Sequence, residues 1–161
     1  MSEKKYINTC CFTGHRPEKL EIPEGKAVKW LNKQIDVAIE DGFTDFITGM
    51  QRGVDIWAAE AVLQRKAQGK ELRLIAACAF NGMEKRWDKF WQDRYNKILS
   101  EADEIHYIGN HPGREAFFGR DEWMVEHSKM LIGVFTGAPG GTKKTIDYAL
   151  KKGLSVIVSG R

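Results

Sequence analysis

The chain has 161 residues, of which 42% are hydrophobic and 29% charged, and its formal net charge is +3. This is the composition of an ordinary folded domain, without the roughly 20 consecutive apolar residues of a membrane span and without the strongly basic balance of a dedicated nucleic-acid-binding protein. The opening segment, MSEKKYIN, lacks the apolar core of a signal peptide. We therefore expect a cytoplasmic protein with one domain over residues 1–161 and no membrane partner.

Short apolar runs alternate with segments of helical period along the chain. The expected strands are 6–12, 45–48, 72–79, 104–108, 130–135 and 154–158. Apolar residues spaced by three and four predict helices around 27–38, 54–62, 87–98, 117–127 and 146–150, the last closed by Gly153. This alternation predicts parallel strands joined by right-handed crossovers. The predicted fold is a three-layer α/β domain with a mostly parallel sheet of about six strands flanked by helices.

An apolar residue, a threonine and a glycine recur at the expected carboxyl ends of three strands: Phe12-Thr13-Gly14, Ile47-Thr48-Gly49 and Phe135-Thr136-Gly137. In an open parallel sheet, ligands bind outside this edge. Each glycine lets a ligand approach the backbone, and each threonine offers a hydroxyl group. Thr-Gly is also common turn chemistry after any strand, but three copies favour a binding site.

His15 and Arg16 follow the first of these turns. Because Arg16 precedes Pro17, its backbone is expected to be extended and its guanidinium to project from the loop. Such a group can grip a phosphate, while His15 donates a hydrogen bond or stacks on a base. The alternative for Arg16 is a surface ion pair with Glu18 or Glu21.

Gly49 and Gly53 frame the second turn, in which Arg52 adds a cation. Asp55 follows in the first turn of the next predicted helix. Its carboxylate either caps that helix or accepts hydrogen bonds from ribose hydroxyl groups.

The third turn, TGAPGGTKKT at 136–145, is the strongest local signal. Gly140 and Gly141 lead directly into a helix, whose free N–H groups and positive dipole end attract an anion. Thr142 is expected to serve both as a helix cap and as a hydrogen-bond donor to the ligand. The segment matches neither the Walker loop nor the dinucleotide motif Gly-x-Gly-x-x-Gly.

Signals for catalysis and for metal binding are weak. Cys10, Cys11 and Cys78 lie in apolar strand-like runs and are expected to be reduced and inert, and no paired Cys/His spacing occurs. No Ser/His/Asp set and no carboxylate pair are apparent at the glycine-rich edge, and Asp121 and Glu122 are expected on a solvated helix face. We predict no metal and no cofactor.

Taken together, these motifs resemble the SLOG superfamily of Rossmann-like domains, which includes the DNA-processing protein DprA/Smf and the Lonely-guy phosphoribohydrolases. The resemblance spans essentially the whole chain and is greatest to the YpsA-like branch, of which FTGHRP is typical. GMQRGVD at 49–55 is similar to the DprA segment Gly-x-x-Arg-Gly-x-Asp. GTKKTIDYA at 141–149 follows the DprA pattern Gly-Ser/Thr-x-x-Thr-x-x-x-Ala.

The resemblance also bears on catalysis. Arg120 and Met124 stand where Lonely-guy enzymes have an Arg-Lys-x-x-Met helix with a catalytic arginine. Those enzymes carry a catalytic glutamate in Pro-Gly-Gly-x-Gly-Thr-x-x-Glu, and Thr145 occupies the corresponding position here. A hydroxyl group cannot act as a general acid or base near neutral pH, so the departure favours binding over hydrolysis. The resemblance further implies that the first, second and fifth strands are neighbours, which would bring all three Thr-Gly turns to one pocket.

We therefore predict a sensor or regulatory module, without strong catalysis, that binds a small nucleotide or an ADP-ribose-like derivative. The alternatives are a nucleoside monophosphate phosphoribohydrolase that uses Arg120 with an unidentified carboxylate, and DprA-like binding of single-stranded nucleic acid through lysines at 143, 144, 151 and 152. Homo-oligomers are common among α/β domains, and Phe117, Phe118 and Trp123 are expected to be exposed enough to form an interface. The candidate ligand-binding residues are Thr13, Gly14, His15, Arg16, Gly49, Arg52, Gly53, Asp55, Phe80, Arg120, Gly140, Gly141, Thr142 and Thr145.

Overall fold

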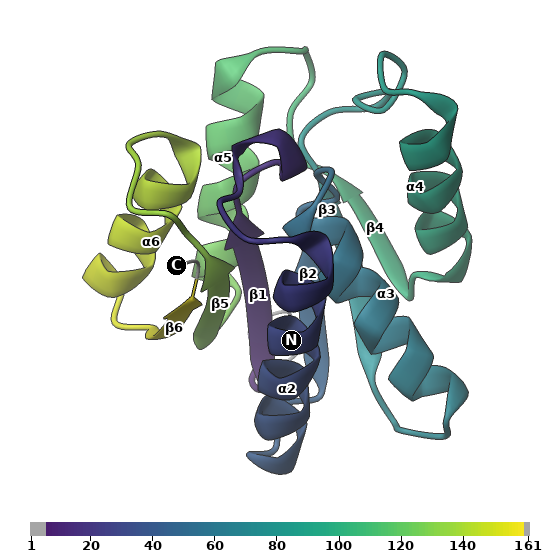
Figure 1. Cartoon of the computed structure of the whole chain (residues 1–161), viewed down its shortest axis with the longest axis vertical. Coiled ribbons are helices and arrows are strands. Elements are labelled where there is room, and N and C mark those ends of the chain that lie inside the picture. Colours follow the sequence, from purple (N-terminus) through teal and green to yellow (C-terminus); the bar gives the residue numbers. More distant parts are fainter. Residues whose placement is uncertain (1–5, 160–161) are drawn as a thin grey trace.

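A computed structural model describes residues 6–159; residues 1–5, which include most of the segment considered for a signal peptide, and residues 160–161 lie outside the described part. Figure 1 shows a central sheet with helices packed on either side. The elements in chain order are β1 (Thr9–Gly14), the short 3-10 helix η1 (Pro17–Lys19), α2 (Glu24–Glu40), β2 (Asp45–Thr48), α3 (Val54–Ala67), β3 (Arg73–Cys78), α4 (Lys89–Glu101), β4 (Glu104–Tyr107), α5 (Arg114–Glu126), β5 (Met130–Val134), α6 (Gly141–Lys151) and β6 (Ser155–Ser159).

The six strands form one parallel sheet in the order β4-β3-β2-β1-β5-β6. Cys10 in the central strand β1 pairs with Phe46 of β2 on one side and with Met130 of β5 on the other. The predicted α/β class, parallel sheet and adjacency of the first, second and fifth strands are confirmed. Their carboxyl ends therefore lie at one edge of the sheet.

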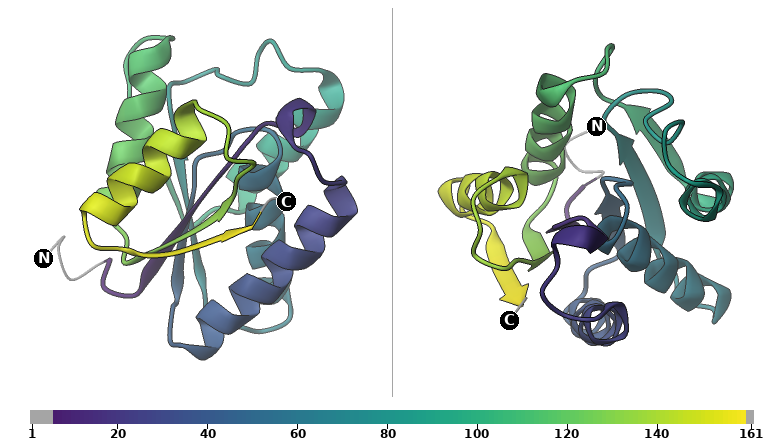
Figure 2. Two further views of the ribbon diagram at one scale, coloured as in Figure 1. Left: turned by 60° about the vertical axis from the view of Figure 1, so that its left-hand side comes forward. Right: turned by 45° about the horizontal axis from the view of Figure 1, so that its top comes forward.

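Alternate residues of each buried strand supply two separate cores, because successive side chains of a strand point to opposite faces. Phe12 and Phe46 pack with residues of α2, α3 and α4, whereas Cys11 and Ile47 pack with residues of α5 and α6. The views in Figure 2 show these two helical layers on opposite sides of the sheet. This two-sided burial explains why the strands are apolar on consecutive residues.

Several predicted boundaries differ from the structure, and the contacts explain the differences at the first strand and at α4. The first strand starts at Thr9, not at Tyr6, and continues through Thr13 and Gly14, because these residues pair with β5. Helix α4, the third of the expected helices, starts at Lys89 and excludes Trp87, since the Asp88 side chain caps it by accepting a hydrogen bond from the Trp91 N–H group at 3.1 Å. The predicted closure at Gly153 is confirmed, with φ of 83° just after α6.

Within residues 6–159, no helix combines the length and apolar character needed to cross a membrane. The same part of the chain holds no group of three or more His, Cys, Asp or Glu residues arranged to bind a metal ion.

Candidate functional site

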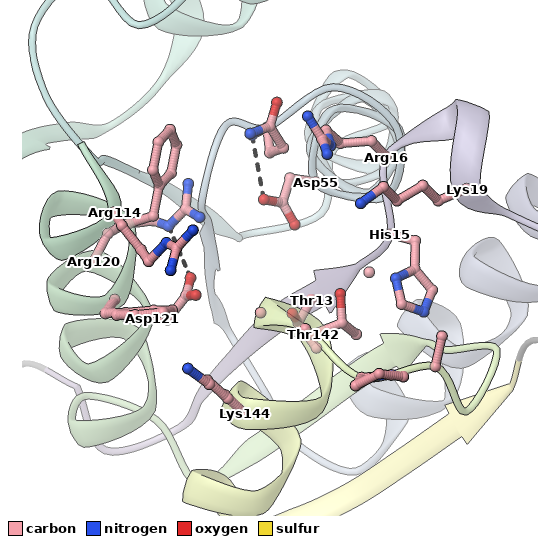
Figure 3. A pocket seen from close by; sticks show the side chains of 18 of the residues that line it. Thr13, His15, Arg16, Lys19, Asp55, Arg114, Arg120, Asp121, Thr142 and Lys144 are labelled. Atoms are coloured by element: carbon pink, nitrogen blue, oxygen red, sulfur yellow. Dashed lines mark hydrogen bonds and ion pairs between the residues drawn. The ribbon is translucent and has the colours of Figure 1, made fainter. Parts of the chain in front are cut away.

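A cavity of about 780 Å³ lies at the carboxyl edge of the sheet, where β1 and β5 end and helices α3, α5 and α6 begin. Figure 3 shows side chains from these elements pointing toward a common space. Of the residues predicted from the sequence, those that line the cavity are Thr13, Gly14, His15, Arg16, Asp55, Arg120, Gly140, Gly141 and Thr142.

Other predicted residues lie outside the lining of this cavity: Gly49, Arg52, Gly53, Phe80 and Thr145. The guanidinium of Arg52 is instead ion-paired with Glu18, with 3.0 Å between Nη2 and Oε2. The ring of Phe80 packs edge-on against Phe117, with 5.6 Å between the ring centroids. Phe117 and its neighbour Phe118, and not Phe80, line the cavity.

The second Thr-Gly turn is closed on itself. The Thr48 hydroxyl donates to the Asp55 carbonyl oxygen at 2.8 Å and accepts from the Met50 N–H group at 3.2 Å. Thr48 is fully buried, and Met50 has a left-handed backbone with φ of 63°. The prediction that all three turns face one pocket is therefore wrong for Thr48-Gly49, and this segment reaches the cavity only through Gln51 and Asp55.

The glycines of the turns serve different purposes. A Cβ atom at Gly49 would lie 2.8 Å from Asp55 Oδ2, and one at Gly53 would lie 3.0 Å from Pro17 Cδ. These glycines permit close packing of the protein against itself. A Cβ atom at Gly140 or Gly141 would meet no protein atom within 4 Å, so the third turn is open on its outer side.

The amino end of α6 forms part of the cavity wall. Gly140 is the N-cap residue and makes no side-chain capping bond, so the predicted capping role of Thr142 is wrong. Gly140, Gly141 and Thr142 all line the cavity. The first turn of a helix has N–H groups without intrahelical partners and carries the positive end of the helix dipole, which makes this wall suitable for an anion.

Cations from several elements surround the cavity. Arg16 has the predicted extended backbone (φ −61°, ψ 156°). Its Nε lies 3.7 Å from Glu18 Oε2, so the surface ion pair with Glu18, the alternative for Arg16, is also present at a long distance. Three cations that were not predicted from the sequence also line the cavity: Lys19, Arg114 and Lys144. No ion pair involving these three is found among the described residues. Figure 3 shows Arg16 and Lys19 on one side of the space and Arg114 and Lys144 on the other.

His15 is a buried part of the cavity wall. Its Nε2 lies 3.1 Å from the Thr136 hydroxyl oxygen, and its ring packs against Phe135 with 5.5 Å between centroids. Burial, assisted by the positive charge of Lys19, lowers the pKa of His15 below its ordinary value. The imidazole is therefore neutral near pH 7 and can offer a hydrogen bond without adding charge.

Arg120 is a buried anchor in the cavity wall. Its Nη1 donates to the Gly49 carbonyl at 2.6 Å, and its Nε donates to Asp121 Oδ1 at 2.9 Å. Burial alone would lower the pKa of Arg120, but Asp121 and Asp55 outweigh burial, so the pKa lies above its ordinary value. The guanidinium is thus fixed in its charged form between α5 and the second turn.

Asp121 is a functional candidate that the sequence reading missed. It was expected on a solvated face, yet its side chain is only 15% exposed and lines the cavity. Its Oδ2 lies 3.1 Å from the Thr145 hydroxyl oxygen, which is also 2.9 Å from the Gly141 carbonyl oxygen. With Asp55, it places two carboxyl groups at the glycine-rich edge, where no carboxylate pair is expected from the sequence. No local sequence signal marks Asp121, because its surroundings depend on the packing of α5 against α6.

Asp55 does not cap α3 in the predicted way. Its Oδ2 accepts a hydrogen bond at 3.2 Å from the Gln51 N–H group, which precedes the helix. Burial raises the pKa of Asp55 to about 7, with Arg120 opposing the rise and Asp121 adding to it. A carboxyl group with this pKa in a cavity wall is typical of functional sites.

The three aromatic residues that were expected to form an oligomer interface are less exposed than the sequence suggests. Phe117, Phe118 and Trp123 are all partly buried. Trp123 stacks on His127 with 4.2 Å between ring centroids, and Phe118 lies under Lys144 Nζ at 4.4 Å from the ring centroid. Trp123 and Phe118 therefore already contact other side chains of the protein, and Phe117 and Phe118 line the cavity.

Comparison with known families and sequences confirms the resemblance. Residues 10–155 match the YpsA model, described as the YspA SLOG family. A UPF0398 protein of Bacillus cereus (strain G9842) is 30% identical over 156 residues, which covers 91% of this chain and 85% of the relative. A UPF0398 protein of Bacillus thuringiensis (strain Al Hakam) shows the same identity and coverage.

Solved structures confirm the fold. DNA processing protein A (DprA) from Helicobacter pylori, described for its unique single-stranded DNA binding mode, aligns with a TM-score of 0.67 at 15% identity, covering 98% of this chain and 67% of that one. DprA from Streptococcus pneumoniae aligns with a TM-score of 0.52 at 14% identity, covering 97% of this chain and 61% of that one. At these identities, the similarity shows a shared fold.

Proposed function

This chain belongs to the YpsA family of SLOG domains, and we propose that it binds a small nucleotide or a nucleotide derivative such as ADP-ribose at the carboxyl edge of its sheet. The observation that carries this proposal is the cavity of about 780 Å³, one wall of which is the uncapped amino end of α6. That volume falls within the usual range for small-molecule sites, about 300–1,000 Å³.

The chemistry of the walls fits the parts of a nucleotide. Gly140, Gly141 and Thr142 offer the helix end for a phosphate group, because a ligand can approach them without meeting a side chain. The surrounding cations would neutralise its charge: Arg16, Lys19, Arg114 and Lys144. Phe117 and Phe118 supply aromatic surface for a base.

Isothermal titration calorimetry with AMP, ADP-ribose and uncharged adenosine tests this function. We expect AMP or ADP-ribose to bind at least about tenfold more tightly than adenosine, because a single charge-assisted phosphate contact accounts for that factor. Absence of heat with all three compounds would contradict the proposal.

A matched pair of variants locates the phosphate. Gly141→Asp introduces a carboxylate at the amino end of α6, where a new side chain meets no protein atom. Gly25→Asp makes the same change in the first turn of α2, which is equally open and does not contribute to the cavity. We expect Gly141→Asp to weaken AMP binding at least about tenfold and Gly25→Asp to leave it unchanged. Equal affinities in the two variants would place the phosphate elsewhere.

Hydrolysis of the nucleotide is a second candidate, favoured by the contact between Asp121 and Thr145. Thr145 stands where Lonely-guy enzymes carry a catalytic glutamate, and the Asp121 carboxylate lies beside its hydroxyl. In such a reaction Asp121 would take a proton from a water molecule whose oxygen bonds to C1′ of a nucleoside monophosphate as the bond between C1′ and the base breaks. The departing base takes up a proton, so the products are ribose 5-phosphate and the free base. Chromatography of AMP incubated with protein should then show free adenine. Asp121→Asn should abolish its release, while Asp147→Asn should not; adenine no higher than in a protein-free control would eliminate this candidate.

Single-stranded nucleic acid is a third candidate, since H. pylori DprA is described as binding single-stranded DNA. The lysines suggested for that role are partly engaged: Lys143 pairs with Asp147 at 2.7 Å, and Lys152 lies over the ring of Tyr148. Nucleic-acid binding would weaken steeply with added salt. Absence of a mobility shift with single-stranded DNA at low salt would eliminate this candidate.

A further inference from the structure

Asp55 has one carboxyl oxygen without a hydrogen-bond partner. The residue is only 6% exposed, Oδ2 accepts from the Gln51 N–H group, and Oδ1 is buried with no partner among the described residues. A buried acceptor left unpaired is costly, and in native proteins it usually has an explanation such as a bound ligand or water. Here Asp55 forms part of the cavity wall.

The two carboxyl groups of the cavity differ in this respect. Asp121 has a partner at each oxygen, Arg120 at Oδ1 and Thr145 at Oδ2. Asp55 therefore offers the one lining carboxyl oxygen, within the described part of the chain, that lacks a protein partner. In Figure 3 its carboxyl group lies in the central space, between Arg120 on one side and His15 on the other.

The charges around Asp55 restrict what can bind its oxygen. A phosphate group would be repelled by the carboxylate, and a cationic ligand would be repelled by the surrounding lysines and arginines. A neutral donor fits both conditions, and the ribose hydroxyl groups are the neutral donors that every ribonucleotide carries, whatever its base. Asp55 stands at the start of α3, whereas the phosphate wall is the start of α6, so phosphate and sugar would contact different walls.

We propose that Asp55 makes this site selective for ribose over deoxyribose, by accepting a hydrogen bond from a ribose hydroxyl at Oδ1. This proposal rests on the nucleotide-binding function proposed above. It identifies ribonucleotides as the class of ligand that the site accepts.

The protonation of Asp55 makes the selectivity dependent on pH. Burial raises its pKa to about 7, so both forms are present near neutral pH, and the carboxylate is the stronger acceptor. The charged or titratable groups that line the cavity with it are Arg120, Asp121 and Arg114 from α5, His15, Arg16 and Lys19 from the segment after β1, and Lys144 from α6. The buried thiol of Cys11 on β1 also interacts electrostatically with Asp55. Selectivity should therefore increase as the pH rises through about 7.

The experiment measures the dissociation constants of AMP and 2′-deoxy-AMP by calorimetry between pH 6 and pH 8. Both ligands lose their second phosphate proton over the same pH range. The ratio of their dissociation constants therefore reports only the contact of the 2′-hydroxyl group. We expect 2′-deoxy-AMP to bind at least about tenfold more weakly at pH 8, as for a hydrogen bond to a charged group. At pH 6 the ratio should fall severalfold, because only about a tenth of Asp55 is then ionised.

Variants identify the residue responsible. Asp55→Asn should make the ratio independent of pH and smaller than in the wild type at pH 8, whereas Asp93→Asn, on the exposed face of α4, should change neither feature. If Asp55→Asn does not fold, the ratio of the two dissociation constants measured with the wild-type protein still tests the selectivity. Binding of neither ligand would overturn the proposed function together with this selectivity. Equal binding at pH 8, or a ratio that rises toward pH 6, would overturn the selectivity and leave nucleotide binding in place.

Discussion

The second and third Thr-Gly turns have similar sequences but opposite structures. The turn after β2 is interlocked: the Thr48 hydroxyl donates to the Asp55 carbonyl at the start of α3, and the Gly49 carbonyl accepts from Arg120. The turn after β5 presents Gly140 and Gly141 to open space at the start of α6. One turn holds protein groups in place, and the other leaves backbone donors available to a ligand.

This contrast shows how the site divides its tasks. Arg120, Asp55 and Asp121 are brought together by the interlocked turn and by α5 before any ligand is present. Preorganised polar groups lose little entropy when a ligand binds, whereas an open helix end can accept anions of different shapes. We expect substitutions in the interlocked turn to affect mainly stability, and those in the open turn to affect mainly binding.

Loss of Arg120 should have the largest effect on the interlocked turn. Arg120→Met removes the charge that faces Asp55 and Asp121 and the donor to the Gly49 carbonyl, while keeping a long apolar side chain. Breaking a buried ion pair on one side typically costs about 3–5 kcal/mol. Urea denaturation at pH 7 should show a loss of this size in the free energy of unfolding. Arg86→Met, an exposed change before α4, is the control, and equal stability of the two variants would contradict the anchoring role.

The buried carboxyl group of Asp55 should make stability depend on pH. Its pKa is about 7 in the folded protein and about 3.9 in an unfolded chain, so folding favours the protonated form. The contribution of Asp55 to the stability of the wild type therefore falls as the pH rises from about 4 to about 7, by up to about 1.4 kcal/mol per pH unit. Asp55→Asn lacks this loss and should gain stability relative to the wild type over that range, with no further change above it.

Urea denaturation of the wild type and of Asp55→Asn at pH 5, 6, 7 and 8 measures how the free energy of unfolding of each protein changes with pH. Asp93→Asn, whose side chain is exposed on α4, should follow the wild type at every pH. Parallel curves for the wild type and Asp55→Asn would show that Asp55 ionises in the folded protein much as it does in the unfolded chain.

The fold could be predicted from the sequence because its signals are local. Consecutive apolar residues mark strands covered on both faces, and apolar residues spaced by three and four mark helices with one buried side. The error at the end of β1 arose because a distant partner sets that end: β1 extends to Gly14 because β5 offers pairing partners through Val134. A pairing of this kind leaves no mark on the strand itself.

The site was predictable only where its signal was local. The helix start at 140–142 and the extended Arg16 follow from glycine and proline chemistry, and both face the cavity. Asp121 could not be found in this way, because neighbouring residues on a helix point in different directions and its bond to Thr145 spans 24 positions. The anchoring of Gly49 by Arg120 spans 71 positions.

Adding one methyl group to each turn gives the smallest effect and the most direct comparison. The Cβ atom of Gly49→Ala would lie 2.8 Å from Asp55 Oδ2 and 3.0 Å from Arg120 Cδ, both in buried groups that cannot move freely. We expect a loss of about 1–3 kcal/mol in the free energy of unfolding, as for other overpacked sites. The same change at Gly141 meets no atom and replaces glycine in the first turn of a helix, so stability should stay level or rise by about 0.4–1 kcal/mol. If the two alanine variants were equally stable by urea denaturation, the second turn would be as open as the third, because a rigid wall at Gly49 cannot accept the methyl group without strain.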